Sequence, residues 1–370
     1  AHHDQGLKIA RQSIVLLKNA NHTLPLNRHL KKIAVIGPNA NNAVSVLGNY
    51  NGTPTHVVTA LEGIKAKVGP ATQVIYNKGV DFTGDSTSYP DYTAIADSVK
   101  DADVIIYVGG IAPQLEGEEM KVNKPGFHGG DRTSILLPAL QTELLKALKA
   151  TGKPVVFVMM TGSAIAAPWE AANLPAIVNA WYGGQSAGTA IADVLFGDYN
   201  PAGRLPVTFY ASDNDLPSFT DYSMNNRTYR YFKGKPLFAF GYGLSYSNFK
   251  YSQLRVPASV NKNSRLVVHV KVTNTSNKDG EEVSELYISH KGLKQRTAIR
   301  ALKGFQRFSL KAGQSKDVTF TLSPEDLCIV GDDGRLIEPK GKLEICAGGS
   351  QPDAQTVKSA KTISRTISII

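Results

Sequence analysis

Long apolar runs are missing from this 370-residue sequence, and none approaches the roughly 20 residues that a membrane-spanning helix needs. The first residues, AHHDQGLKIARQ, contain neither the charged n-region nor the apolar h-region of a signal peptide. We therefore predict a chain without a membrane span. A leader was either never present or was removed together with something upstream, which leaves the cell compartment open.

Cysteine is nearly absent, since the chain contains only Cys328 and Cys346. Two cysteines do not make a zinc site. Two buried thiols on neighbouring strands and a single disulfide are both compatible with the spacing.

Motifs for nucleotide binding and for a nucleophilic serine are also absent. GPNANN, after the first apolar run, matches neither GxGxxG nor GxxxxGKS/T. Ser163 in TGSA and Ser186 in GGQSAG do not fit the GxSxG elbow. The carboxylates near residue 118 lack the spacing of an EF-hand. We therefore expect no cofactor and no metal.

Acidic residues are fewer than basic ones, with 31 Asp and Glu against 41 Lys and Arg. Most of the basic surplus lies after Tyr251, where it is spread singly along alternating segments without a tight cluster or interleaved aromatic residues. This distribution is typical of a solvated, mildly basic surface rather than a groove that follows phosphates. We expect no nucleic-acid partner.

Four short apolar runs are present in the first half of the chain, and each ends in glycine or a small polar loop. They occupy residues 32–40, 103–110, 154–162 and 176–184. Continuous apolar runs indicate strands buried on both faces of a parallel sheet. Segments with helical spacing lie between or after them, most clearly at 132–152 and 186–198. The pattern predicts an α/β domain whose mostly parallel sheet is sandwiched by helices.

From about Lys250 the pattern changes to alternation of apolar and polar residues. RLVVHVKVTNTS, EEVSELYISH and SKDVTFTLS are examples, with turn residues such as NKDG and KAGQ between them. Short alternating strands at this spacing predict an antiparallel β-sandwich.

An acidic loop follows the second apolar run, in the stretch VIIYVGGIAPQLEGEEM. Glu116, Glu118 and Glu119 lie within four positions there. In α/β sheets ligands bind outside the carboxyl ends of the strands, where this loop falls. Repulsion from its neighbours would favour the protonated form of the middle acid. A protonated glutamic acid in a crevice suits a glycosidase, although a solvated acidic loop gives the same pattern.

Several segments together resemble the C-terminal portion of glycoside hydrolase family 3, the β-glucosidases and β-xylosidases. They include ARQSIVLLKNANHTLPL, KKIAVIGPNA, GGDRTSILLPALQTELLKAL, AIVNAWYGGQSAGTAIADVLFGDYNPAGRLPVTF and FAFGYGLSY, in family order over nearly the whole chain. The resemblance implies a segment leaving a (β/α)8 barrel at 1–20 and an α/β sandwich domain at 21–240. A connector at 241–257 and a fibronectin type III-like domain at 258–370 would follow.

The resemblance also implies the roles of individual residues. Glu118 is the best match to the family's general acid/base, with Glu116 and then Glu119 as fallbacks. Asp131 and Arg132 match the family's Asp-Arg pair, and we expect them to brace the loop as an ion pair. The nucleophile of the family is an aspartate of the barrel, and nothing in this chain matches its motif. A retaining mechanism would then place the active site between this chain and a barrel, in cis or as a separate chain.

The stretch LGNYNGTP resembles the β-xylosidase branch, which favours xylo-oligosaccharides. A β-glucosidase is the alternative, and a non-catalytic carbohydrate-binding or structural module is another. The expected partners are a β-linked oligosaccharide and the barrel, and the oligomeric state stays open. Four sequons begin at Asn21, Asn51, Asn226 and Asn274 and carry little weight. The family suggests a secreted or periplasmic protein.

Overall fold

The computed structural model describes residues 2–84, 90–261 and 263–370, which fall into two compact units. The first unit comprises Ala1–Gly203, Phe209–Asp215 and Lys235–Phe238, and the second comprises Arg204–Thr208, Leu216–Gly234 and Ala239–Ile370. No helix in the described ranges is both long enough and apolar enough to cross a membrane.

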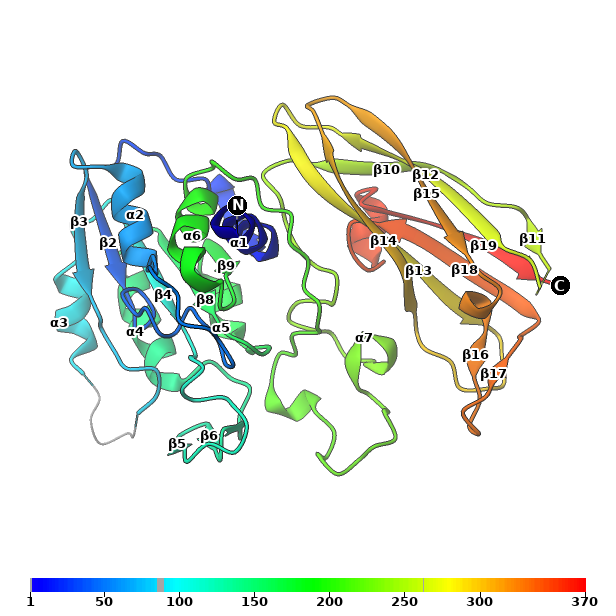
Figure 1. The fold of residues 1–370 in the computed structure, drawn as a ribbon, viewed down its shortest axis with the longest axis horizontal. Coiled ribbons are helices and arrows are strands. Elements are labelled where there is room, and N and C mark those ends of the chain that lie inside the picture. The colour runs from blue at the N-terminus through cyan, green and yellow to red at the C-terminus, as the bar shows by residue number, and fades with distance from the viewer. Residues whose placement is uncertain (1, 85–89, 262) are drawn as a thin grey trace. The chain divides into compact units, whose positions relative to one another are not determined.

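The first unit is built on a six-stranded sheet in the order β1-β9-β8-β4-β2-β3 (Figure 1). The strands are β1 (Val15–Asn19), β2 (Lys32–Ile36), β3 (Gln73–Asn77), β4 (Val104–Gly110), β8 (Val155–Met160) and β9 (Ala176–Asn179). The strands from β3 to β9 are parallel, and β1 joins the edge of β9 antiparallel. The four apolar runs are therefore parallel strands, as predicted. The sequence pattern did not predict β1 or β3.

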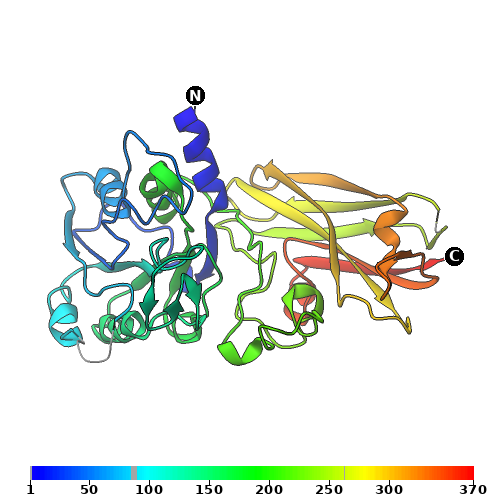
Figure 2. The ribbon, with the colours of Figure 1, turned by 60° about the horizontal axis from the view of Figure 1, so that its bottom comes forward.

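Helices cover both faces of this sheet. They are α1 (His2–Ser13), α2 (Ala60–Val68), α3 (Tyr92–Asp97), α4 (Ala139–Ala150), α5 (Pro168–Asn173) and α6 (Ala187–Leu195). The helices α1, α2 and α6 pack together, while α3 and α5 both contact α4 (Figures 1 and 2). Right-handed crossovers place the two groups on opposite faces, because the chain moves outward from β2 to β3 and then back across to β4. The connections after β2 and β4 thus diverge, and in such sheets ligands bind at the carboxyl ends of the strands where this happens.

The helix predicted over 132–152 begins only at Ala139. Residues before it are extended, with Asp131–Arg132 forming strand β7 and Leu136 bridging to Ala166. Pro138 explains the difference, because a proline disfavours helical dihedrals in the residue before it and is well tolerated at a helix start. The extended stretch brings the end of the acidic loop close to the segment that follows β8.

The second unit is a β-sandwich. One sheet has the order β10-β12-β15 and the other β11-β19-β18-β13-β14. The strands are β10 (Phe249–Arg255), β11 (Ser259–Val260), β12 (Leu266–Asn274), β13 (Gly280–Lys291), β14 (Ala301–Leu310), β15 (Ser315–Leu322), β18 (Gly341–Gly348) and β19 (Thr362–Ile369). Its pairs are antiparallel except for the short pair of β11 with β19. Valines of β12 and aliphatic residues of β18 share one core between the sheets. The predicted sandwich is confirmed.

Strand β13 departs from the predicted alternation, since nearly all of its residues are buried. Part of the chain before the sandwich covers its outer face: Tyr229 lies edge-on to Tyr287 of β13 and stacks on Phe240 at 4.2 Å between ring centroids. Arg204 from the same covering layer pairs with Glu282 at 2.7 Å. A strand covered on both faces has no polar side, so alternation fails there.

The expected domain ranges differ from the observed units at several places, among them Arg204–Thr208, which lies in the sandwich unit. Strand β1 and helix α1 lie in the α/β unit, where β1 pairs with β9 and α1 packs against α6. Residues 216–234 belong to the sandwich unit. Strand β10, inside the expected connector at 241–257, pairs with β12 as a full member of the sandwich.

Both cysteines are free thiols, and they do not lie on neighbouring strands. Cys346 is in β18, whose partners are β13 and β19, whereas Cys328 precedes the small hairpin of β16 (Ile329–Val330) and β17 (Leu336–Ile337). This hairpin takes Cys328 out of the main sheets. Burial raises the pKa of Cys346 to about 12.

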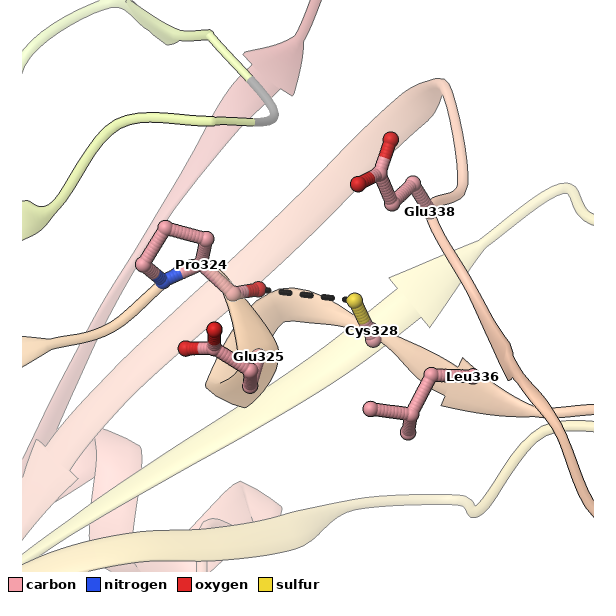
Figure 3. Close-up of a pocket in the computed structure, with 5 residues that line it drawn as sticks. All are labelled: Pro324, Glu325, Cys328, Leu336 and Glu338. Carbon is pink, nitrogen blue, oxygen red and sulfur yellow. Dashed lines mark hydrogen bonds between the residues drawn. The ribbon is translucent and has the colours of Figure 1, made fainter.

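Cys328 lines a pocket of about 450 Å³ together with Pro324, Glu325, Leu336 and Glu338 (Figure 3). Its thiol donates to the Pro324 carbonyl at 3.5 Å. Burial raises the pKa of Cys328, and the carboxylates of Glu338 and Glu325 add to the effect. The group stays a thiol at neutral pH and is therefore a poor nucleophile. The pocket carries no candidate chemistry.

Glu285 on β13 makes the stability of the sandwich depend on pH. Burial raises its pKa to about 7, against the opposing effects of the Tyr287 hydroxyl and Arg204. The folded state then holds a proton that the unfolded state has released between pH 4.5 and 7. Stability should therefore fall as pH rises through this window, by on the order of 2–3 kcal/mol. Glu285→Gln should remove that dependence, since the side chain stays neutral.

Urea unfolding at pH 5 and pH 8, followed by circular dichroism, measures this effect. Tryptophan fluorescence separates the two units, because Trp169 and Trp181 both lie in the first one. Asp317→Asn, at an exposed position of β15, is the matched control and should keep the wild-type pH dependence. A Glu285→Gln variant with the wild-type slope would contradict the assignment.

Candidate active site

Three loops at the carboxyl edge of the parallel sheet meet at the Glu116 side chain. Its Oε1 accepts hydrogen bonds from the Gly162 amide at 2.8 Å and the Tyr182 hydroxyl at 2.7 Å. Its Oε2 accepts one from the Ser163 hydroxyl at 2.7 Å. Gly162 and Ser163 follow β8, and Tyr182 follows β9. One carboxylate therefore fastens the loop after β4 to the loops after β8 and β9.

Gly162 permits this arrangement because it has no side chain. A Cβ there would lie 2.8 Å from Glu116 Oε1 and 2.9 Å from Tyr182 Cε2. Both distances are shorter than real Cβ contacts, and both atoms are already fixed by the hydrogen bonds to Glu116. The glycine after β8 is thus required by the close approach of the carboxylate.

The loop after β2 contributes a second set of contacts. Asn49 Nδ2 donates to the Glu116 carbonyl at 2.7 Å, and the Tyr50 hydroxyl donates to Glu118 Oε2 at 2.8 Å. Tyr50 is 90% exposed, and Glu118 is exposed as well. The two glutamates therefore have different surroundings: Glu116 is partly buried and fully engaged, whereas Glu118 faces solvent beside a phenol.

The acidic loop folds back on itself through backbone contacts. The Gly117 amide donates to the Gly130 carbonyl and the Met120 amide to the Gly129 carbonyl, both at 3.0 Å. A Cβ on Gly130, at φ +93°, would meet the Gly117 carbonyl oxygen at 1.8 Å, so only glycine fits. This closure holds Glu118 at the turned end of the loop. The next residue, Glu119, has a left-handed backbone with φ 50°.

Arg132 braces the loop from its far end. It donates from Nε to Ser134 O at 3.0 Å, from Nη2 to Leu136 O at 3.1 Å and from Nη1 to Ser163 Oγ at 3.3 Å. Burial lowers the pKa of Arg132, and the nearby Glu116 carboxylate opposes that effect. Its neighbour Ser163 is shared with Glu116, which links the two ends of the loop.

The expected ion pair between Asp131 and Arg132 is not among the ion pairs of the described residues. Both residues lie in strand β7, where Asp131 is opposite His128 of strand β6 (Phe127–His128). Successive side chains of a strand point to opposite faces, so neighbours cannot meet. Arg132 instead takes carbonyl and hydroxyl partners, and Asp131 is exposed.

The tyrosines of the site remain neutral donors around pH 7. Burial raises the pKa of Tyr182 far above its ordinary value, and the Glu116 charge raises it further. The hydrogen bond to Glu118 raises the pKa of Tyr50, with a smaller effect of burial. Glu116 and Glu118 thus each have their own phenol. The structure thereby separates the three acids that looked like one repelling cluster.

Sequence reasoning found the loop and its acids but missed the residues that hold them. Asn49 and Tyr50 entered only as part of LGNYNGTP, Tyr182 only as part of the run at 176–184, and Ser163 only as a rejected nucleophile. The signal that could have found them is positional. Each lies in a loop after a parallel strand, where such loops share one edge of the sheet.

Residues 14–246 match the profile of the glycosyl hydrolase family 3 C-terminal domain, and residues 282–351 match that of a fibronectin type III-like domain. The chain belongs to glycoside hydrolase family 3. It is 35% identical to a xylan 1,4-β-xylosidase of Xylanibacter ruminicola, covering 97% of this chain and 58% of that protein. It is also 35% identical to a β-xylosidase of Formosa agariphila, covering 99% of this chain and 50% of that protein.

Two solved structures agree with the fold. A β-glucosidase from Erythrobacter marinus superposes with a TM-score of 0.84 at 32% identity, over 100% of this chain and 50% of that one. An exo-β-xylosidase of family 3, solved with a xylobiose aziridine probe, gives a TM-score of 0.85 at 26% identity, over 100% and 48%. The chain thus spans about half the length of the family members it matches.

The structural role of Glu116 can be measured without any substrate. Glu116→Ala leaves three donors without their acceptor and should lower the free energy of unfolding of the first unit by about 2 kcal/mol. Glu118→Ala, at an exposed position with one hydrogen-bond partner, should change it by less than about 0.5 kcal/mol. Urea unfolding followed by tryptophan fluorescence reports on this unit. Equal effects of the two substitutions would show that Glu116 does not brace the loops.

Proposed function

We propose that this chain supplies the general acid/base of a retaining, exo-acting β-glycosidase and that Glu118 is that residue. The observation that carries the proposal is the exposed Glu118 carboxylate, which is held by one phenol at the carboxyl edge of the sheet. In this family-3 chain a (β/α)8 barrel domain, in cis or as a separate chain, would supply the nucleophile.

Glu118 suits proton transfer better than its neighbours do. Both oxygens of Glu116 are occupied by the three donors that fasten the loops, so a proton transfer there would disrupt the brace. Glu118 Oε2 accepts from Tyr50, and in the described part of the chain Oε1 accepts no hydrogen bond. One oxygen is thus held while the other is free to meet a glycosidic oxygen.

The chemistry follows the retaining pathway. In the first step Glu118 donates its proton to the glycosidic oxygen while the barrel carboxylate attacks the anomeric carbon, and the leaving group departs with that proton. In the second step Glu118, now ionised, takes a proton from the water that attacks the glycosyl-enzyme ester. The sugar leaves with retained configuration, and Glu118 is protonated again.

The proposed substrate is a terminal β-linked xylose of a xylo-oligosaccharide. Support comes from the GNY segment beside Glu118 and from two relatives that are named β-xylosidases. A β-glucosidase activity is the second candidate, because relatives at 33% and 32% identity, from Salmonella typhimurium and Erythrobacter marinus, are named β-glucosidases. The Salmonella relative is named periplasmic, which fits our proposal of a secreted or periplasmic protein.

Substitution of Glu118 tests the proposal in an enzyme that joins this chain to a family-3 barrel domain. Glu118→Ala should lower turnover on unactivated disaccharides by about 10²–10⁴-fold, the usual contribution of a positioned acid/base. The loss should be much smaller for aryl glycosides whose leaving groups depart without protonation. The chain alone should show no hydrolysis above background.

Glu143→Gln, at the surface of α4, serves as the control and should keep wild-type turnover. The assignment is wrong if Glu118→Ala remains near wild type on disaccharides while Glu119→Ala is inactive. Appreciable hydrolysis by the 370-residue chain alone would contradict a mechanism in which this chain and a barrel domain each supply one carboxylate.

A further inference from the structure

Tyr50 combines an exposed side chain with a specific hydrogen-bond partner. Its side chain is 90% accessible, and yet its hydroxyl donates to Glu118 Oε2 at 2.8 Å across 68 positions of sequence. Burial of the ring therefore does not explain its place in the fold. The contact that it makes is with the proposed acid/base.

The turn that carries Tyr50 is strained and firmly closed. Tyr50 has φ 54°, a left-handed conformation that bulky residues seldom adopt, and Gly48 has φ 74°. Strain of this kind persists only where surrounding contacts enforce it. Asn51 Nδ2 closes the turn on the Gly48 carbonyl at 2.9 Å, and Asn49 ties it to the Glu116 carbonyl at 2.7 Å.

Two successive residues of this turn thus hold two parts of the acidic loop. Asn49 fixes the main chain at Glu116, which is itself fastened to the loops after β8 and β9. Tyr50 then reaches the Glu118 carboxylate from a position set by that anchor. A phenol fixed in this way selects one orientation of an otherwise exposed carboxylate.

We propose that Tyr50 is a positioning residue for Glu118, whose hydroxyl holds Oε2 so that Oε1 is directed to the glycosidic oxygen. The inference rests on the proposed role of Glu118 and adds to it a residue that does not itself exchange a proton with substrate. The strained backbone of Tyr50 then contributes to this positioning, because a relaxed backbone would direct the phenol away from Glu118.

Other titratable groups belong to the same loop as Glu118 or contact its neighbour Glu116. Glu116 and Glu119 belong to the same loop, Tyr182 and Arg132 face Glu116, and Tyr50 alone of the described residues donates to the Glu118 carboxylate. The raised pKa of Tyr50 keeps its phenol protonated through the neutral range. The donor is therefore present in both steps of the proposed reaction.

The contact can be tested in the chain by itself. With tyrosines labelled at Cζ, carbon NMR should show Tyr50 ionising above the ordinary pH for a phenol, and Glu118→Gln should move that midpoint down toward the ordinary value. Glu143→Gln should leave it unchanged. If the ionisation midpoint of Tyr50 is the same in the Glu118→Gln variant as in the wild type, the inference is overturned before any activity is measured.

The functional test compares Tyr50→Phe with Tyr76→Phe in the enzyme joined to a barrel domain. Tyr76 lies on edge strand β3 and is also exposed, so its variant controls for loss of a surface phenol. Tyr50→Phe should lower turnover on disaccharides by about tenfold through misplacement of the acid. The loss should nearly vanish for activated aryl leaving groups.

A merely structural Tyr50 would lower turnover equally for all leaving groups, which would contradict the inference. Equal turnover of the Tyr50→Phe and Tyr76→Phe enzymes on disaccharides would also contradict it. Failure of the proposed function can be distinguished from failure of the Tyr50 inference, because the Glu118→Ala enzyme would then keep its turnover on disaccharides. The inference that Tyr50 positions an acid/base would fall with it, although the NMR contact would persist.

Discussion

The Glu116 carboxylate is the constraint on which the candidate site depends. Three donors from two other loops converge on it, and its own main chain is held by Asn49. The Glu116 side chain thus joins the loops after β4, β8 and β9, and Asn49 joins the loop after β2 to the Glu116 main chain. Hydrogen bonds to a charged acceptor are stronger than neutral ones, which suits a single residue to this task.

Two glutamates two positions apart therefore have different surroundings. The loop turns between them at Gly117, whose carbonyl approaches Gly130 so closely that no side chain would fit. Glu116 faces the protein and Glu118 faces solvent. Chemical identity and sequence spacing do not distinguish them, but hydrogen-bond partners do. This division is why we assign proton transfer to Glu118 and structure to Glu116.

Much of the fold was predictable from the sequence, because buried parallel strands are continuous apolar runs that end in glycine. The prediction was wrong where one local rule overrode another. Pro138 delays the helix that the spacing predicted from 132, and the covered outer face of β13 removes its alternation. The acidic loop was also predictable, since it follows a strand. The tyrosine partners of its glutamates were not predictable, because no spacing rule relates Tyr50 to Glu118 or Tyr182 to Glu116.

Azide trapping tests the central claim most directly. In the enzyme joined to a barrel domain, an activated aryl glycoside forms the glycosyl-enzyme without help from an acid, and only its breakdown needs the base. With Glu118→Ala, added azide should attack that intermediate, restore turnover and yield a β-glycosyl azide, because a small anionic nucleophile needs no base. The Glu116→Ala enzyme, which keeps its base, should yield the free sugar with or without azide. Formation of β-glycosyl azide by Glu116→Ala and not by Glu118→Ala would contradict the account.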